Sequence, residues 1–227
     1  MIRRFFTDIA GVYDRMNHLL SLGLDRRWRR LAAAEVKVSP ARILDLACGT
    51  GDFAFELARR FPEADVLGVD LTPAMLDIAR RKNSSQKIDF AEGDALDLSP
   101  VGMRGRFSLC TCAFGFRNFP DRRKALGEVR RVLSPGGELL VLEFFRPANA
   151  VLGFLTSVWL KALAALFARR KSAAYRYLRQ SMQGMDTVEM FVAQADECGF
   201  SLASRRFFFP CCTCLHFAAR RGRSGLS

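Results

Sequence analysis

The sequence predicts an α/β fold built on a doubly wound, seven-stranded and mostly parallel sheet. Between residues 41 and 144, strand-like apolar runs alternate with amphipathic helical stretches, which is typical of parallel β-α-β units. Two further apolar runs near the C-terminus are joined by a short connection around Pro210, which predicts an antiparallel hairpin. At 227 residues the chain is long enough for one well-buried core, and we expect a single domain.

Seven strands and four helices are expected at defined positions. The strands are expected at residues 42–46, 65–69, 88–91, 107–113, 138–144, 201–209 and 215–219. The helices are expected at residues 52–61, 73–81, 121–133 and 187–198. Thr72 and Pro73 predict the start of the second helix, as its N-cap and its first helical residue. The sequence Ser134-Pro135-Gly136-Gly137 predicts a turn that ends the third helix.

Two segments fall outside this alternation. Residues 1–36 form a helical preface that is rich in arginine and aromatic residues. Residues 148–184 form an insertion, within which Val151–Ala168 is apolar apart from Lys161 and two hydroxyl residues. This stretch is short for a membrane span, and a central lysine is costly there. We expect a helical lid over a hydrophobic substrate or a helix that lies on a membrane, with simple packing on the sheet as the alternative.

A glycine turn between two carboxylates is the most informative motif in the chain. Gly49 and Gly51 follow the first strand, and Asp45 and Asp52 stand on either side of them. Glycine suits positions where the backbone takes a positive φ or a ligand approaches closely. The spacing Gly49-x-Gly51-x-x-Ala54 also fits a dinucleotide fingerprint, but the acids would repel a pyrophosphate by about 4 kcal/mol per charge pair at 4 Å. We therefore expect a cationic cofactor, S-adenosylmethionine, bound at Asp45, Gly49 and Gly51.

Acidic residues also follow the next two strands. Asp70 ends the second strand, where its carboxylate can accept hydrogen bonds from both ribose hydroxyls of the cofactor. Asp94 follows the third strand and can accept from the adenine amino group, with the Ala95 amide nearby for a ring nitrogen. In an open α/β sheet, ligands bind beyond the carboxyl ends of the strands. These residues are therefore expected to belong to one cofactor site.

Charge is unevenly distributed along the chain, whose net charge is +12. Residues 43–100, which contain the glycine turn, carry eleven acidic and six basic side chains, whereas the flanking parts are basic. Basic flanks suit an anionic lipid surface, nucleic acid or an acidic substrate, and ordinary solvated arginines are the alternative.

The cysteines and the N-terminus bear on metals and on the cellular compartment. The spacing of the seven cysteines does not match a zinc site, so no metal is expected. No secretory signal is recognised, so we expect a cytoplasmic protein with reduced thiols.

Several segments beyond the glycine turn carry a family resemblance. They are residues 6–17, 21–30, 114–118 (Phe-Gly-Phe-Arg-Asn), 133–137, 142–144 and 175–181. Together they resemble the ubiquinone/menaquinone biosynthesis C-methyltransferases, which are class I S-adenosylmethionine-dependent methyltransferases. The glycine turn is shared by many methyltransferases, whereas the preface and Phe-Gly-Phe-Arg-Asn are highly specific. The resemblance implies that Thr50, Asp70, Asp94 and Ala95 contact the cofactor. A serine that contacts it in some relatives is replaced by Ala113 here.

The resemblance implies methyl transfer to a ring carbon of a polyprenylated quinol, in the menaquinone or the ubiquinone pathway. The ring carbon becomes nucleophilic when a phenol that titrates near pH 10 loses its proton, and a guanidinium within about 4 Å would favour this by about three pK units. We expect Arg117 to stabilise the phenolate and Asn118 to hydrogen-bond a quinol oxygen. Tyr13 is expected beside these catalytic residues, and Asn17 and Phe116 in the substrate pocket.

The expected partners are a lipidic quinol and an anionic membrane surface, which the protein would meet peripherally at the inner membrane face. One alternative is a methyltransferase for RNA or for another small molecule, although no aromatic-rich RNA motif is present. No nucleic acid partner is therefore expected. Another alternative is a non-catalytic cofactor-binding scaffold of quinone synthesis. An oligomer is compatible with the sequence.

Overall fold

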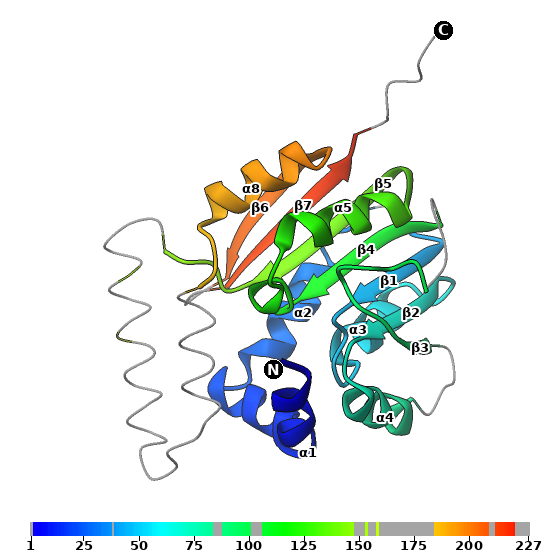
Figure 1. Cartoon of the computed structure of the whole chain (residues 1–227), viewed down its shortest axis with the longest axis vertical. Coiled ribbons are helices and arrows are strands. Elements are labelled where there is room, and N and C mark those ends of the chain that lie inside the picture. Colours follow the sequence, from blue (N-terminus) through cyan, green and yellow to red (C-terminus); the bar gives the residue numbers. More distant parts are fainter. Residues whose placement is uncertain are drawn as a thin grey trace, which may run out of the picture.

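Seven strands form one sheet in the order β3-β2-β1-β4-β5-β7-β6 (Figure 1). The structure is a computed structural model that describes residues 2–37, 39–83, 88–100, 106–147, 153, 158, 184–208 and 212–220. The strands are β1 (Arg42–Leu46), β2 (Asp65–Asp70), β3 (Ile88–Glu92), β4 (Phe107–Ala113), β5 (Leu133–Glu143), β6 (Phe200–Phe208) and β7 (Cys212–Ala219). Strands β1 to β5 pair in parallel, whereas β7 pairs antiparallel with both β5 and β6. The predicted mostly parallel sheet with a terminal hairpin is confirmed.

Helices cover both faces of this sheet. They are α1 (Ile2–Leu20), α2 (Leu24–Ala33), α3 (Asp52–Arg60), α4 (Pro73–Lys82), the 3-10 turn η1 (Phe116–Asn118), α5 (Arg122–Val132) and α8 (Val188–Glu197). Helices α5 and α8 pack on one face, and α2 and α3 pack on the other (Figure 1). Helix α1 lies against α4 and α2, near the carboxyl ends of the parallel strands. The arrangement is doubly wound, as the alternation of strands and helices predicts.

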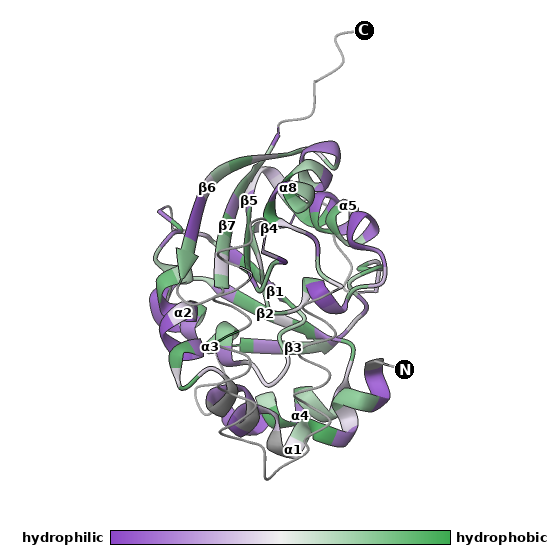
Figure 2. Ribbon diagram, turned by 90° about the vertical axis from the view of Figure 1, so that its left-hand side faces the viewer, coloured by the Kyte–Doolittle hydropathy of each residue, from purple (hydrophilic) through white to green (hydrophobic). Residues whose placement is uncertain are grey.

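The alternation of side chains along β1 decides which residues face which layer. Leu44 and Leu46 pack in the core under α5 and α8, whereas Ile43 packs with α2 and α3. Because successive strand residues point to opposite faces, Asp45 shares the α2 and α3 face with Ile43. The central strand β4 and the stretch 139–142 of β5 are mostly hydrophobic, and the edge strand β6 is hydrophilic along part of its length (Figure 2).

The start of β5 differs from the sequence prediction. Ser134–Gly137 was expected as a turn, but these residues lie within β5, and Leu133 pairs with Phe107 of β4. The register shifts between Phe107 and Leu109, and Gly136 takes a φ of 76°. The Ser134 hydroxyl donates to the Phe107 carbonyl, which holds this irregular stretch against β4. Residues that usually form turns therefore form an irregular, bulged start of β5 here.

The two segments outside the alternation have different outcomes. The expected helical preface corresponds to α1 and α2. Nearly all of the insertion at residues 148–184, including most of Val151–Ala168, lies outside the described residues. Among the residues that are described, no helix is long and apolar enough to cross a membrane.

Candidate active site

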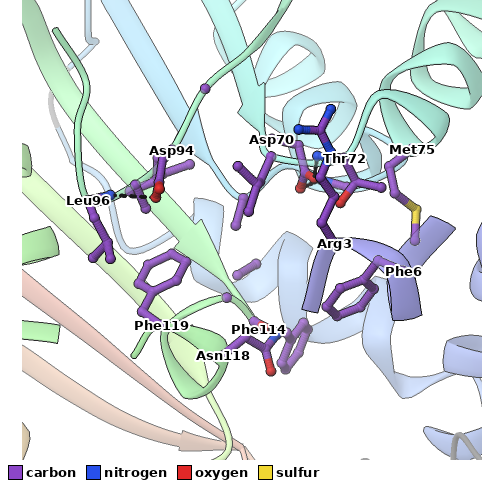
Figure 3. A pocket seen from close by; sticks show the side chains of 18 of the residues that line it. Arg3, Phe6, Asp70, Thr72, Met75, Asp94, Leu96, Phe114, Asn118 and Phe119 are labelled. Carbon is purple, nitrogen blue, oxygen red and sulfur yellow. Dashed lines mark hydrogen bonds between the residues drawn. The ribbon is translucent and has the colours of Figure 1, made fainter. Parts of the chain in front are cut away.

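A cavity of about 370 Å³ opens at the carboxyl ends of β1, β2, β3 and β4. This is the edge where the strand order reverses between β1 and β4, which is where open α/β sheets bind ligands. Asp70 and Asp94 lie on one side, which we call the acidic side, and Phe6, Phe114 and Asn118 lie on the other, which we call the aromatic side (Figure 3). The volume lies within the range of small-molecule sites.

Asp70 anchors the acidic side at the end of β2. Its Oδ2 accepts from the Gly49 amide at 2.9 Å, and its Oδ1 accepts from the Thr72 amide at 2.8 Å. Burial raises the pKa of the Asp70 carboxyl, and the two amides act in the opposite direction. Each oxygen keeps a second lone pair with which it can accept from a ligand hydroxyl. Thr72 stands at the N-cap of α4 as predicted, but its side chain makes no capping hydrogen bond.

Asp94 and Ala95 extend this side beyond β3. Both line the cavity, together with Leu96. The Asp94 carboxylate accepts from the Leu96 amide at 2.9 Å, which fixes its orientation (Figure 3). Asp94 is exposed and Ala95 is buried, so a ligand here would have one apolar contact and one solvated acidic contact.

The glycine turn joins β1 to α3, and its two glycines have different roles. Gly49 takes a φ of 56° and lines the cavity, so its backbone can approach a ligand closely. Gly51 takes a φ of 86° at the N-cap of α3, and a Cβ there would come within 2.9 Å of the Phe55 ring. Gly51 therefore shapes the turn and does not line the cavity among the described residues.

Thr50 was expected to contact the cofactor, and the structure gives its hydroxyl a different partner. The hydroxyl donates to the Asp14 carboxylate of α1, and the Thr50 side chain is almost fully buried. Lys82 of α4 pairs with Asp14 at 2.5 Å and also donates to the Thr50 carbonyl at 3.3 Å. These contacts tie α1 and α4 to the glycine turn.

Asp45 is 1% exposed and lies under the glycine turn, on the α2 and α3 face. It stands in register with Thr111 of β4, whose hydroxyl donates to its Oδ1 at 2.7 Å. Burial raises the pKa of the Asp45 carboxyl from 3.8 to about 7, against the opposing effects of Thr111 and the Arg29 charge. A buried carboxylate of this kind is stabilised by a cationic ligand.

Two non-glycine residues with left-handed backbone face the cavity. Ala47 after β1 has a φ of 53°, and Phe114 after β4 has a φ of 61°. Such conformations cost about 1–3 kcal/mol each and cluster at functional sites. The Phe114 turn is held from both sides: its amide donates to the Leu142 carbonyl at 2.8 Å, and its carbonyl accepts from Arg117 at 2.6 Å.

Arg117 and Phe116, both predicted at the substrate, lie behind the aromatic side. The Arg117 guanidinium pairs with the fully buried Glu143 at 2.8 Å, and its side chain is 7% exposed. Phe116 is fully buried in the core, against Phe119 and Phe191. Neither residue is among the described residues that line the cavity, so the expected pocket position of Phe116 is corrected to a supporting one. Asn118 does line the cavity.

Helix α1 also lines the site, and the sequence analysis identified only some of its residues there. Tyr13 lines the cavity as expected, and Asn17 supports it through a side-chain hydrogen bond. Burial raises the pKa of the Tyr13 hydroxyl, so it keeps its proton at neutral pH. Arg3 and Phe6 also line the cavity, and Phe6 packs edge-on against Tyr13 with ring centroids 5.8 Å apart. The seven-residue spacing of Phe6 and Tyr13, which places both on one helix face, was the available signal.

The described residues fit S-adenosylmethionine in their chemistry. Asp70 and Asp94 offer acceptors for ribose and adenine, and Gly49 leaves room for a close approach. Asp45 supplies a buried carboxylate whose Oδ2 has no hydrogen-bond partner among these residues, although the Ala54 amide is near enough to lower its pKa. The walls carry no described basic residue opposite these acids other than Arg3 and Arg29, of which Arg3 pairs with Glu92 at 2.7 Å.

Comparisons with known proteins agree with this chemistry. The family profile "ubiE/COQ5 methyltransferase family" matches residues 1–220. The chain is 42% identical to the demethylmenaquinone methyltransferase of Deinococcus radiodurans, over 92% of this chain and 88% of that protein. It is 45% identical to the Thermus thermophilus protein of the same name, over 87% and 91%.

A solved structure supports the fold alone. It is a chain from the complex between the Haloferax volcanii Trm112 methyltransferase activator and a methyltransferase. The TM-score is 0.69 at 16% identity, and the match covers 95% of this chain and 98% of that one. The chain therefore belongs to the ubiE/COQ5 methyltransferase family and is a class I methyltransferase that uses S-adenosylmethionine as its cofactor.

Proposed function

We propose that the protein methylates a ring carbon of demethylmenaquinol and so produces a menaquinol. The observation that carries this proposal is the similarity, over nearly the whole of both chains, to proteins named demethylmenaquinone methyltransferase. The aromatic side of the cavity suits a flat, apolar acceptor, because Phe6, Phe114 and Phe119 line it.

The acceptor oxygen can receive hydrogen bonds from two side chains. S-adenosylmethionine, when bound, supplies an electrophilic methyl group on a sulfonium. Asn118 lines the cavity, and its Nδ2 carries two hydrogens, one of which is directed to the Phe114 carbonyl at 3.5 Å. The Tyr13 hydroxyl stays protonated because burial raises its pKa. Two neutral donors on one quinol oxygen stabilise the phenolate that makes the neighbouring ring carbon nucleophilic. In the reaction, this carbon exchanges its hydrogen, which is released as a proton, for the methyl group, and the other products are S-adenosylhomocysteine and the menaquinol. The apolar walls keep water from the reacting atoms, and positioning supplies much of the acceleration.

Arg117 supports this side by positioning the Phe114 turn. Its guanidinium bridges Glu143 and the Phe114 carbonyl, and it stacks over the Phe114 and Phe144 rings at 5.8 and 5.7 Å. Because Glu143 neutralises the charge, we infer a positioning role in place of direct contact with the phenolate. Arg117→Lys should lower kcat about tenfold at every pH while the affinity for S-adenosylhomocysteine stays within twofold. Arg117→Gln removes the charge that lysine keeps, so a kcat profile displaced to higher pH in Arg117→Gln but not in Arg117→Lys would instead show that the guanidinium charge stabilises the phenolate.

A parallel methyl-transfer assay tests the acceptor. Labelled S-adenosylmethionine is supplied with demethylmenaquinol, with the demethylated benzoquinol precursor of ubiquinone, and with bulk RNA. Label should enter demethylmenaquinol, and Asp70→Ala should lower that transfer about 100-fold when S-adenosylmethionine is far below saturation. Equal transfer to the benzoquinol would widen the proposed function to the ubiquinone step, and label entering only RNA would overturn it.

We also propose that the protein meets its lipidic substrate at an anionic membrane surface on the inner face. Exposed basic side chains occur on both α1 and α2, and the turn between these helices carries Leu22, whose surface is 53% exposed. The basic residues are Arg4, Arg15, Arg26, Arg27 and Arg30. Each basic residue near an anionic surface adds about 1 kcal/mol of attraction.

Vesicle sedimentation tests the membrane proposal. Binding to vesicles with an anionic lipid should exceed binding to neutral vesicles and should fall as salt is added. Arg26→Glu with Arg30→Glu should weaken it about tenfold or more. Arg59→Glu with Arg60→Glu, an exposed pair on α3, is the matched control. Equal binding to both vesicle types at all salt concentrations would contradict the proposal.

A further inference from the structure

The last turn of α4 carries a lysine that contacts three other elements beside the glycine turn. Lys82 Nζ lies 2.5 Å from Asp14 Oδ2 of α1 and 3.0 Å from Asp52 Oδ1 at the start of α3. It also donates to the Thr50 carbonyl of the turn at 3.3 Å. A lysine ammonium group has three N–H donors, so these three contacts occupy all of them. Lys82 itself is not among the described residues that line the large cavity.

Thr50 is the residue of the glycine turn on which these contacts meet. It stands between Gly49 and Gly51, whose φ values are 56° and 86°. Glycine leaves the backbone free to adopt other conformations, so the residue types of the turn do not hold its shape. Lys82 binds the Thr50 carbonyl, and Asp14 accepts from the Thr50 hydroxyl. Both the backbone and the side chain of Thr50 are therefore fixed from outside the turn.

The same contacts hold α1 against the turn. Asp14 directly follows Tyr13, and a Cβ added at Gly49 would lie 3.8 Å from the Tyr13 ring. Tyr13 lines the large cavity and also a smaller one of about 30 Å³ under the glycine turn. Other residues that line this smaller cavity include Arg29, Asp45, Thr50 and Asp52. The contact between Asp14 and Lys82 therefore sets the position of a side chain that borders both cavities.

Charge explains why a cation is needed at this position. The Asp14 and Asp52 carboxylates both contact the same nitrogen, so they lie close together, and each is only about one-third exposed. Without the ammonium group they would repel each other beside the glycine turn. That repulsion would displace Asp14, and with it the neighbouring Tyr13. The end of α4 also favours a cation, because the helix dipole is negative there.

We propose that Lys82 is a positioning residue that holds the cofactor and acceptor parts of the site together. Through Thr50 it fixes the glycine turn, whose Gly49 borders the cofactor cavity. Through Asp14 it fixes Tyr13, which donates to the acceptor oxygen. One side chain outside the large cavity thus acts on both binding partners. The acceptor half of this inference rests on the proposed function, whereas the cofactor half does not depend on which acceptor the enzyme uses.

The dissociation rate of S-adenosylhomocysteine tests the cofactor half independently of activity. Lys82→Met removes the charge and keeps a long side chain. Stopped-flow fluorescence should show dissociation about tenfold faster than in the wild type, because two partly exposed ion pairs are lost. Lys82→Arg keeps the charge and should stay within about threefold of the wild type. Arg81→Met, at an exposed position in the same turn of α4, is the matched control and should leave the rate unchanged.

Steady-state kinetics with demethylmenaquinol tests the acceptor half. Lys82→Met should lower kcat about fivefold and raise the KM for the quinol, because Tyr13 is no longer held in place. Asp14→Asn breaks the same contact with Lys82. The double variant, Asp14→Asn with Lys82→Met, should therefore lose no more kcat than Lys82→Met alone.

Three results separate this proposal from its alternatives. If Lys82 only stabilises the fold, the free energy of unfolding falls while the dissociation rate and kcat of the folded Lys82→Met variant stay at wild-type values, which overturns the proposal. Losses of kcat that add in the double variant also overturn it, because Lys82 would then not act through Asp14. If the wild-type protein does not methylate demethylmenaquinol, the proposed function fails, and the dissociation rates still decide the cofactor half.

Discussion

The acidic and aromatic sides of the cavity are built in different ways. Asp70 and Asp94 come from the ends of neighbouring strands, and backbone amides hold their carboxylates. The aromatic side combines α1 with the turn after β4, and the buried Arg117–Glu143 pair supports it from behind. The difference indicates that sheet pairing fixes the cofactor end, whereas long-range side-chain contacts fix the acceptor end. Substitutions on either side, or under the glycine turn between β1 and α3, test this difference.

Glu143→Ala should have the largest effect, and it acts on the aromatic side. It leaves the buried Arg117 charge without its carboxylate partner, which costs about 3–5 kcal/mol in the free energy of unfolding. Urea denaturation measures this loss. Arg131→Ala breaks a more exposed pair with Glu128 and should cost about 1 kcal/mol or less. Similar losses in both variants would mean that the buried pair does not support this side.

Asp70→Ala should affect the acidic side through ligand binding. Hydrogen bonds to a charged group contribute about 1.5–3 kcal/mol, so the affinity for S-adenosylhomocysteine should fall about 100-fold. 5′-Methylthioadenosine has the same ribose as S-adenosylhomocysteine and lacks its amino-acid group, so its affinity should fall by the same factor. Asp97→Ala, an exposed carboxylate in the turn after β3, is the control. Calorimetry that gives an unchanged affinity would exclude Asp70 from the ribose site.

The pH dependence of binding should report the Asp45 carboxyl, which lies under the glycine turn. Its pKa of about 7 means that the ligand-free protein is largely protonated there below pH 7. A bound ammonium group favours the carboxylate, so binding releases a proton and strengthens as pH rises. The affinity for S-adenosylhomocysteine should increase about eightfold from pH 6 to pH 7.5 and then level off.

Two controls separate Asp45 from its neighbours in that experiment. Asp45→Asn should flatten the pH dependence. 5′-Methylthioadenosine has no ammonium group, so its remaining pH dependence measures Asp70, whose pKa burial also raises. An identical pH dependence for both ligands would contradict the assignment to Asp45.

Asp14→Asn should have the smallest effect, because it loosens α1 over the cavity without touching the strand ends. The Asp14–Lys82 pair is about one-third exposed and contributes about 1 kcal/mol or less. The dissociation of S-adenosylhomocysteine should quicken by about two- to fivefold, as stopped-flow fluorescence can measure. Asp8→Asn on an exposed position of α1 is the control. If the wild-type dissociation rate does not rise with salt, the Asp14–Lys82 ion pair does not hold α1 over the cavity.

The acidic side could be predicted from sequence because its signals are local. The bounds of β1 and β4 agree with the prediction, Asp70 ends β2, and Asp94 follows the end of β3 by two residues. Arg117 and Asn118 are close in sequence, yet only Asn118 lines the cavity, because the partner of Arg117 is 26 residues away at Glu143. No local pattern reports a contact of that kind.

Residues of the preface were harder to place for the same reason. Asp14 reaches Thr50 across 36 residues, and Arg29 of α2 reaches the cavity under the glycine turn only because α2 packs beside α3. Ser134–Gly137 was assigned to a turn from its residue types, whereas pairing with β4 decides its conformation. Tertiary contacts override local preference at each of these positions.

The register between β1 and β4 links the cofactor to the folding of the sheet. Asp45 reaches Thr111 only when Ile43 lies opposite Leu109, and a slip of one residue would turn Asp45 toward the apolar face that holds Leu44. Only the correctly paired chain can then bind the cofactor, which stabilises it by about 2.7 kcal/mol at a ligand concentration of 100 Kd. The methyl donor thus also selects the correctly registered fold against mispaired ones.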